Sequence, residues 1–147
     1  MFVYTAKLNK RRGIAILLVA AAALIAIILI ASHSGKNSVK TNEDRIKYLT
    51  DIGWEVCIEP VEHESIVIPS DMTQVYEDYN ALQLAQGFDL TKYAGMEAER
   101  YTYEVRNHPD CTDAVYADII ICKNRVIAGD IQSISANGFM QGLEFPK

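Results

Sequence analysis

The chain lacks the common sequence signatures of catalysis. It contains no Gly-x-Ser-x-Gly, no His-Glu-x-x-His and no glycine-rich phosphate loop, which excludes the motifs typical of serine hydrolases, zinc proteases and nucleotide-binding enzymes. Imidazole bases are also few, because the only histidines are His33, His63 and His108. We expect His33 in a linker and the other two in turns, so the sequence predicts neither a catalytic set nor a cofactor.

Cysteine is equally scarce. Cys57, Cys111 and Cys122 form no Cys-x-x-Cys pair and match no zinc-binding spacing. An odd number of cysteines cannot all pair within one chain. The strands predicted below separate Cys111 from Cys122 too widely for a disulfide, whereas a bond between Cys57 and Cys122 stays open. We predict three unpaired cysteines and no metal site.

Acidic residues are absent from the first 42 positions, and a long apolar run lies there instead. Residues 14–31 read IAILLVAAAALIAIILIA, after a tail that carries Lys7, Lys10, Arg11 and Arg12. Eighteen helical residues span about 27 Å, close to the thickness of a hydrocarbon core. Because basic residues favour the cytoplasmic side, we predict a cytoplasmic tail over 1–13, a single transmembrane helix over 14–31, and the rest of the chain outside.

A cleaved signal peptide is the alternative for this segment. The apolar region of a signal peptide is usually shorter, about 7–15 residues, and ends at a small-x-small cleavage site. Ser32-His33-Ser34 is only a weak version of that site. The length of the run therefore favours a retained anchor.

The part of the chain beyond the apolar run is strongly acidic. It holds ten of the 14 basic residues and all 19 acidic residues, a formal charge of −9. This charge argues against binding to nucleic acid or to an anionic lipid surface. It fits a domain that is held off the membrane or that meets a basic partner.

Two helices are predicted in the outer part. Residues 32–42 are small and polar and indicate a linker, which leaves 43–147 for one domain with one core. The helices cover about 43–52, capped by Thr41 or Asn42, and about 72–86, capped by Ser70 or Asp71. Each ends at a glycine followed by an aromatic residue, Gly53-Trp54 and Gly87-Phe88, as is typical of a Schellman ending.

Five strands complete the predicted order α-β-β-α-β-β-β. Two are short, 54–58 and 65–68, with a turn between them at 61–64; three are longer, 97–106, 115–122 and 125–131. A two-residue turn at Lys123-Asn124 joins the last two strands. Short links of this kind imply an antiparallel sheet with both helices on one face, which is an α+β domain.

Two acidic residues, Asp118 and Asp130, face each other in this scheme. Gly129 beside Asp130 marks a place where another chain or a ligand comes close. Facing carboxylates need a cation, a shared proton or a basic neighbour such as Arg100, so the pair is a candidate site. The simpler interpretation, which we favour at this stage, places both on the solvated face with Arg100 and Arg106 as cross-strand partners.

Aromatic residues supply the other candidate binding positions. Tyr76, Tyr79, Tyr101 and Tyr103 can line a groove between the second helix and the sheet, where tyrosine suits recognition of peptide or sugar. Packing at the edge of the core explains the same spacing. Phe139 lies in the segment 137–143, NGFMQGL, which suggests a shaped loop or a turn that covers an edge strand.

Several segments together resemble the family DUF4830, a domain of unknown function. They are Gly53-Trp54-Glu55-Val56, Glu59-Pro60, residues 79–83 and 86–90, Arg100-Tyr101-Thr102-Tyr103, Gly129-Asp130 and residues 138–143. The resemblance covers most of 45–143. It implies a short membrane-anchored or secreted protein of Gram-positive anaerobes and brings no activity. The chain departs from the family pattern at Ala128 and at Gln141.

Three functions stay open at this point. We favour a non-enzymatic, membrane-anchored extracytoplasmic domain that binds a protein or peptide of the bacterial cell envelope. Its candidate binding residues are Asp130, Asp118, Arg100, Tyr79, Tyr101, Tyr103 and Phe139. The alternatives are a cell-surface enzyme that uses Asp118 and Asp130, and a structural subunit of a membrane assembly joined through the span.

Overall fold

Three long strands form the centre of the fold. The computed structural model describes residues 38–146 except 72 and 112. Strands β2 (Glu97–Val105), β3 (Val115–Cys122) and β4 (Arg125–Ser133) pair antiparallel in chain order, close to the predicted ranges. Lys123 and Asn124 close the β3–β4 hairpin, both with positive φ, as the twist of a two-residue turn requires.

The two edge strands differ from the prediction. β1 (Glu62–Val67) and β5 (Met140–Gln141) complete a sheet of order β1-β2-β3-β4-β5. The strand predicted over 54–58 is wrong, because Val56 makes only an isolated bridge to Val105. The turn predicted at 61–64 is also wrong, since most of it belongs to β1. The strand predicted over 65–68 is confirmed in part, since β1 begins three residues earlier, where the side chains are exposed and show no apolar alternation.

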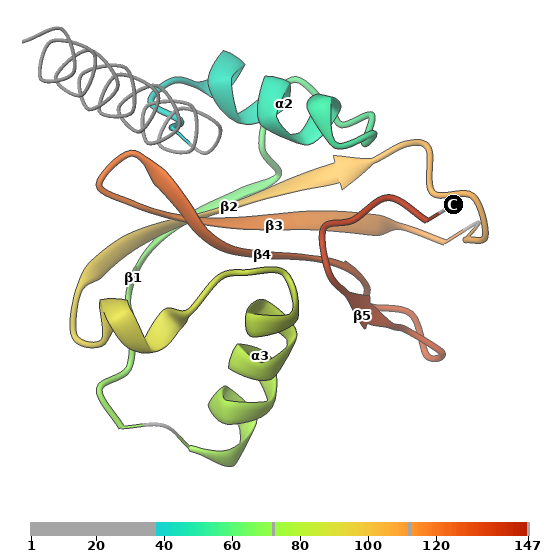
Figure 1. Ribbon diagram of the computed structural model, residues 1–147. Helices are drawn as coiled ribbons and strands as arrows, with labels where there is room; N and C mark the ends of the chain where they lie inside the picture. Colours follow the sequence, from blue (N-terminus) through green and yellow to red (C-terminus); the bar gives the residue numbers. More distant parts are fainter. Residues whose placement is uncertain (1–37, 72, 112, 147) are drawn as a thin grey trace, which may run out of the picture. The chain divides into compact units, whose positions relative to one another are not determined.

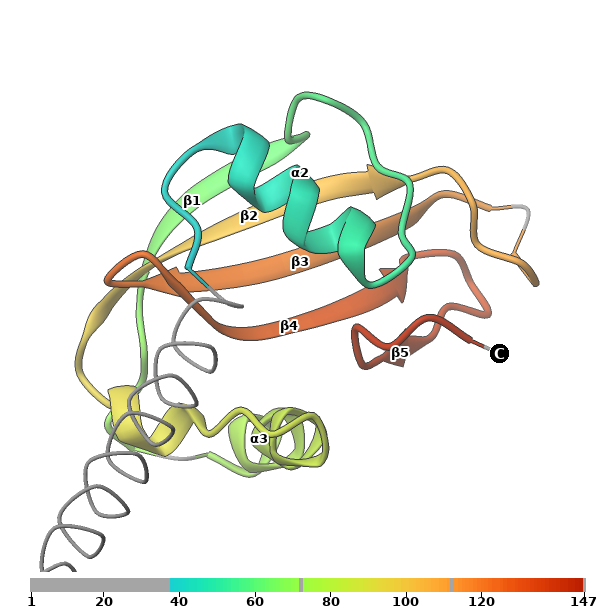
Figure 2. The ribbon, with the colours of Figure 1, turned by 45° about the horizontal axis from the view of Figure 1, so that its top comes forward.

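The two helices cover opposite faces of the sheet (Figures 1 and 2). α2 (Asn42–Asp51) packs with an apolar cluster that includes Leu49, Trp54 and Ile119. α3 (Gln74–Ala85) and a short 3-10 helix, η1 (Leu90–Tyr93), pack with a second cluster that includes Ile120. The prediction of both helices on one face is therefore wrong, because β3 is apolar on both faces and each face needs cover.

The ends of the helices follow the sequence closely. Thr41 caps α2 in a capping box with Asp44, whereas α3 begins after Thr73 rather than after Ser70 or Asp71. The Schellman endings are confirmed. The N–H of Trp54 donates to the Leu49 carbonyl, and the N–H of Phe88 donates to the Gln83 carbonyl, both at 3.0 Å.

The described fold starts inside the segment expected to be a linker. Val39 is buried in the core, and Ser38 forms a bridge to Arg125. The tail and span predicted over 1–13 and 14–31 lie outside the described residues. Within the described residues, no helix has the length and apolar character needed to cross a membrane.

Glutamine side chains of α3 close the part of the β4 edge that β5 does not pair. Gln83 Oε1 accepts from the Gly129 N–H at 2.9 Å, and Gln86 Nε2 donates to the Gly129 carbonyl at 3.0 Å. Gln86 Oε1 also accepts from the N–H of Leu143 at 2.6 Å, whose carbonyl accepts from Trp54 Nε1 at 2.7 Å. These bonds join α3, β4 and the C-terminal segment.

Gly129 is required at this junction. A Cβ at this position would lie 2.6 Å from Leu143 Cδ1 and 2.7 Å from the backbone oxygen of Asp118. Another chain or a ligand was expected to come close at Gly129, whereas the neighbour in the structure is a segment of the same chain. The segment is the C-terminal one, whose residues 140–141 pair with the β4 edge.

We expect Gln83→Leu to lower the free energy of unfolding by about 1–3 kcal/mol, because the buried Gly129 N–H loses its acceptor. Gln74→Leu is the matched control, since it makes the same change at an exposed position of the same helix and should shift stability by less than about 0.5 kcal/mol. Urea denaturation of the full chain in detergent measures both. Equal losses in the two variants would contradict this role of Gln83.

Candidate functional site

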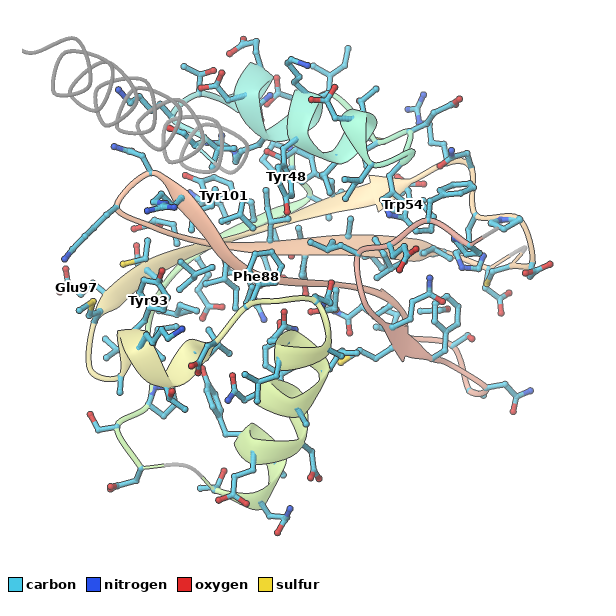
Figure 3. The ribbon with its side chains drawn as sticks, in the orientation of Figure 1. Tyr48, Trp54, Phe88, Tyr93, Glu97 and Tyr101 are labelled. Atoms are coloured by element: carbon cyan, nitrogen blue, oxygen red, sulfur yellow. The ribbon has the colours of Figure 1, made fainter. Side chains whose placement is uncertain are left out.

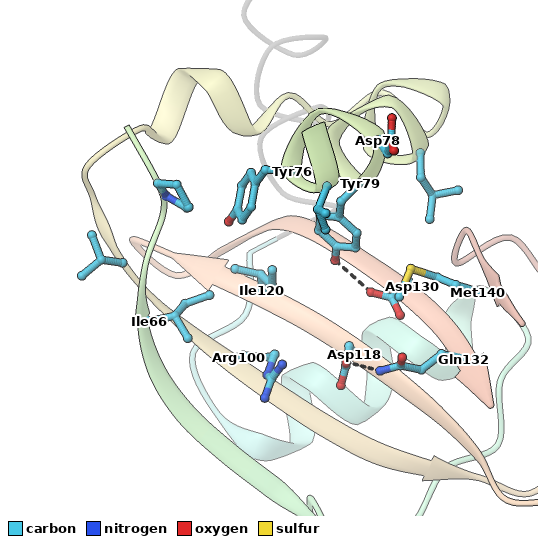
Figure 4. Close-up of a pocket in the computed structure, with 14 residues that line it drawn as sticks. Ile66, Tyr76, Asp78, Tyr79, Arg100, Asp118, Ile120, Asp130, Gln132 and Met140 are labelled. Carbon is cyan, nitrogen blue, oxygen red and sulfur yellow. Dashed lines mark hydrogen bonds between the residues drawn. The ribbon is translucent and has the colours of Figure 1, made fainter. Parts of the chain in front are cut away.

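A pocket of about 750 Å³ lies between α3 and the sheet (Figure 4). This volume is in the range of small-ligand sites, about 300–1,000 Å³. Much of its wall is apolar and includes Ile66, Val67, Val75, Leu82, Ile120 and Met140. The sheet also contributes Arg100, Asp118, Asp130 and Gln132, which gives an apolar pocket with a polar floor.

Asp118 on β3 and Asp130 on β4 are direct cross-strand partners, as predicted. Their side chains are not solvated, because only 5% of Asp118 and 2% of Asp130 is exposed. The interpretation of a solvated face is therefore wrong, since α3 covers this face. Arg106 is not a partner either, and its guanidinium donates to Cys57 Sγ at 3.3 Å.

The two carboxylates have unequal hydrogen bonding. Asp118 accepts from the hydroxyl of Thr102 at Oδ1 and from Gln132 Nε2 at Oδ2, the latter at 2.7 Å. Asp130 Oδ2 accepts from the hydroxyl of Tyr79 at 2.8 Å, and Figure 4 shows this tyrosine reaching from α3 towards the sheet. Asp130 Oδ1 is buried and has no partner. It is therefore the one carboxylate oxygen of this pair left without a donor.

Arg100 lies beside the pair but does not bond to it. Its Nη2 contacts Glu64 at 2.8 Å and Glu62 at 3.4 Å, both on β1. Its Nε is buried without a partner. The positive charge of Arg100 is thus shared with two glutamates, and the site as a whole stays acidic.

Burial changes the ionisation of these groups. Burial, followed by the charge of Asp118, raises the pKa of Asp130 to about 7, against the opposing effects of Tyr79 and Arg100. Burial also raises the pKa of Asp118, while Thr102, Arg100 and Gln132 oppose the rise. The pKa of Tyr79 is raised by burial and by Asp130, so its hydroxyl stays a donor. Near neutral pH the pair therefore holds a proton for part of the time.

Three predicted site residues lie elsewhere. Tyr101 and Tyr103 project from β2 to the α2 side, opposite to Arg100, and Figure 3 shows Tyr101 on that side of the sheet. Tyr103 accepts from Arg45 Nε at 2.8 Å. Phe139 packs against the same cluster. The structure thus brings together Tyr79, Arg100, Asp118 and Asp130, and Tyr76 joins them in the pocket wall.

Sequence reasoning missed Thr102, Gln132 and Met140. Thr102 lies two positions after Arg100, and Gln132 lies two positions after Asp130. Residues two apart in a strand point to the same face, so this alternation could have identified both. The segment 137–143 was expected to cover an edge strand, and its residues Met140 and Gln141 do pair with β4. The place of Met140 in the pocket wall was not predicted.

Metal and disulfide chemistry receive no support among residues 38–146. No group of three or more His, Cys, Asp or Glu side chains in the described part of the chain could hold a metal ion. Cys57, Cys111 and Cys122 are all free thiols in the structure.

The fold and the pocket define a small α+β domain with a buried acidic pair. The family model for the domain of unknown function DUF4830 matches residues 48–131, more than half of the chain. The protein therefore belongs to the DUF4830 family. The matched range includes both aspartates and ends before β5. No curated protein and no solved structure matches the chain.

Stability should depend on pH through Asp130. Its pKa is about 7 in the folded protein and near 3.8 in the unfolded chain. The folded state therefore keeps a proton that the unfolded state loses, and this contribution is complete below about pH 4 and is lost as the pH rises to about 7. We expect the free energy of unfolding of the wild type to fall by about 2–4 kcal/mol between pH 4 and 8, relative to Asp130→Asn.

Urea denaturation of the full chain at both pH values measures this difference. Asp51→Asn, on the exposed surface of α2, is the matched control and should follow the wild type. If the wild type and Asp130→Asn differ in free energy of unfolding by the same amount at both pH values, the carboxyl of Asp130 has an ordinary pKa and this prediction is wrong.

Proposed function

We propose that this protein is a non-enzymatic binding module of the bacterial cell envelope, and that the pocket between α3 and the sheet receives a peptide or a protein segment. The observation that carries the proposal is an open pocket with an apolar mouth above a buried acceptor, Asp130 Oδ1, that has no partner. Sites that bind ligands combine mostly apolar walls with a few polar groups in this way.

The mouth of the pocket exposes apolar side chains. The exposed fractions are 79% for Val75, 62% for Val67 and 51% for Met140. They come from α3, from β1 and from β5, so they gather around the pocket although they are distant in the sequence. Gathered apolar surface of this kind often marks an interaction site.

The location of this module is part of the proposal. The basic tail over 1–13 and the apolar run over 14–31 favour a single span with the C-terminal domain outside. The negative charge of the outer part agrees with a ligand that carries positive charge. No nucleic acid is expected as a partner.

An enzyme that uses Asp118 and Asp130 is the second candidate. A carboxyl with a pKa near 7 beside a second carboxylate suits general acid–base work. Both oxygens of Asp118 are engaged by Thr102 and Gln132, so within this pair only Asp130 has a carboxylate oxygen without a donor. This asymmetry favours binding over a reaction that needs two free carboxylates.

The anchor can be tested by extraction of cell membranes. We expect the protein to stay in the membranes through a high-salt wash and to be released by detergent, because the apolar run would lie in the bilayer. Release by salt, or a mature N-terminus near residue 35, would contradict the anchor.

Photocrosslinking in intact cells tests the pocket. A photoreactive amino acid at Val75 should give a discrete adduct, and the same residue at Lys47, exposed on α2, should not. Val67→Trp should remove the adduct by filling the mouth of the pocket. Adducts of equal yield at both positions, or an adduct that survives Val67→Trp, would count against binding there.

A further inference from the structure

We propose that the pocket recognises a primary ammonium group on an apolar stem, such as the side chain of a lysine in a peptide, and that Asp130 Oδ1 is the acceptor for that group. This inference rests on the proposed binding function and specifies its ligand. It concerns the chemistry at the floor of the pocket, whereas the proposed function concerns the pocket as a whole.

Charge supports a cationic ligand. Asp118 and Asp130 form the floor from β3 and β4, Glu62 and Glu64 approach from β1, and the cation beside them, Arg100, is bound to those two glutamates. From α3 the pocket is faced by Asp78, Tyr76 and Tyr79. The acidic groups outnumber the single cation, so a positive ligand gains from the field of the site.

An unpartnered oxygen shows where the cation would bind. Asp130 is 2% exposed, its Oδ1 has no hydrogen-bond donor, and its side chain lines the pocket. A buried acceptor without a donor is costly, and a ligand that supplies the donor removes that cost. Because Tyr79 already occupies Oδ2, a two-pronged guanidinium would find only one free oxygen. A compact ammonium group can donate to that oxygen with one of its three N–H groups.

The walls fit an aliphatic stem. Ile66, Ile120 and the ring of Tyr76 also line the pocket, and lysine packs its methylene groups against such surfaces. Arg100 adds a buried Nε that has no acceptor, which a peptide carbonyl can fill. A peptide supplies both the ammonium group and the carbonyl.

Binding of the ammonium group should release a proton. The cation favours the ionised form of Asp130, so the proton that the pair holds near neutral pH passes to the buffer when the ligand binds. Affinity for the cation should therefore rise as the pH rises from 6 to 8, while affinity for an uncharged analogue should not change.

Isothermal titration calorimetry of the full chain in detergent tests this, with the acetylated amide of Leu-Lys-Leu and its analogue with norleucine in place of lysine. We expect the lysine peptide to bind about 10-fold or more tightly. Titrations in two buffers of different ionisation enthalpy should show release of about 0.9 proton at pH 6, about 0.5 at pH 7 and almost none at pH 9.

Two variants separate the site from general charge. Asp130→Asn should abolish both the preference for lysine and the proton release, and its far-UV circular dichroism should match that of the wild type and thus show an intact fold. Asp51→Asn removes one negative charge from α2, on the opposite face of the sheet. It should keep both the preference for lysine and the release of a proton.

Equal binding of the two peptides, binding without proton release, or binding of neither peptide would overturn the inference. An adduct at Val75 in cells together with any of these results would leave the binding module standing and reject only the ammonium ligand. Absence of that adduct would reject both proposals.

Discussion

The contact between α3 and two consecutive residues of β4 is the constraint on which the pocket depends. Gln83 and Gln86 bind the backbone of Gly129, and Tyr79 binds the carboxylate of Asp130. Positions 79, 83 and 86 lie on one side of a helix, so a single helix face completes the sheet edge and approaches the acidic pair. Because polar bonds fix this face, apolar residues such as Val75 remain exposed at the mouth of the pocket.

The same arrangement explains why a carboxyl can be buried with one oxygen unsatisfied. Burial removes the water that would stabilise two charges, and it raises the pKa of both carboxyls, so that Asp130 keeps a proton up to about pH 7. This costs stability at neutral pH, in the region where the domain leaves space for a ligand. Functional sites commonly break the local rules that the rest of a fold obeys, and the buried aspartates Asp118 and Asp130 are such an exception on two strands that are otherwise mostly apolar.

Sequence patterns predicted the centre of the fold well. The range of β3, the turn at Lys123-Asn124, the Schellman endings and the pairing of Asp118 with Asp130 all follow from local chemistry and strand register. The patterns failed where the position of an element depends on contacts with residues that are distant in the sequence. β1 exposes most of its side chains, several of which form polar pairs with β2, and α3 buries the polar residues Asn80 and Gln83. Burial of the acidic pair was missed for the same reason, since only α3 removes it from water.

The central claim is that Asp130 is a buried carboxyl that lines the pocket and keeps a proton up to about pH 7. Titration of its carboxyl carbon by NMR in the full chain tests this most directly, with the signal assigned from Asp130→Asn. We predict a pKa near 7, and a lower pKa when Asp118→Asn removes the neighbouring charge. A pKa near the ordinary value of 3.8, unchanged by Asp118→Asn, would contradict the account.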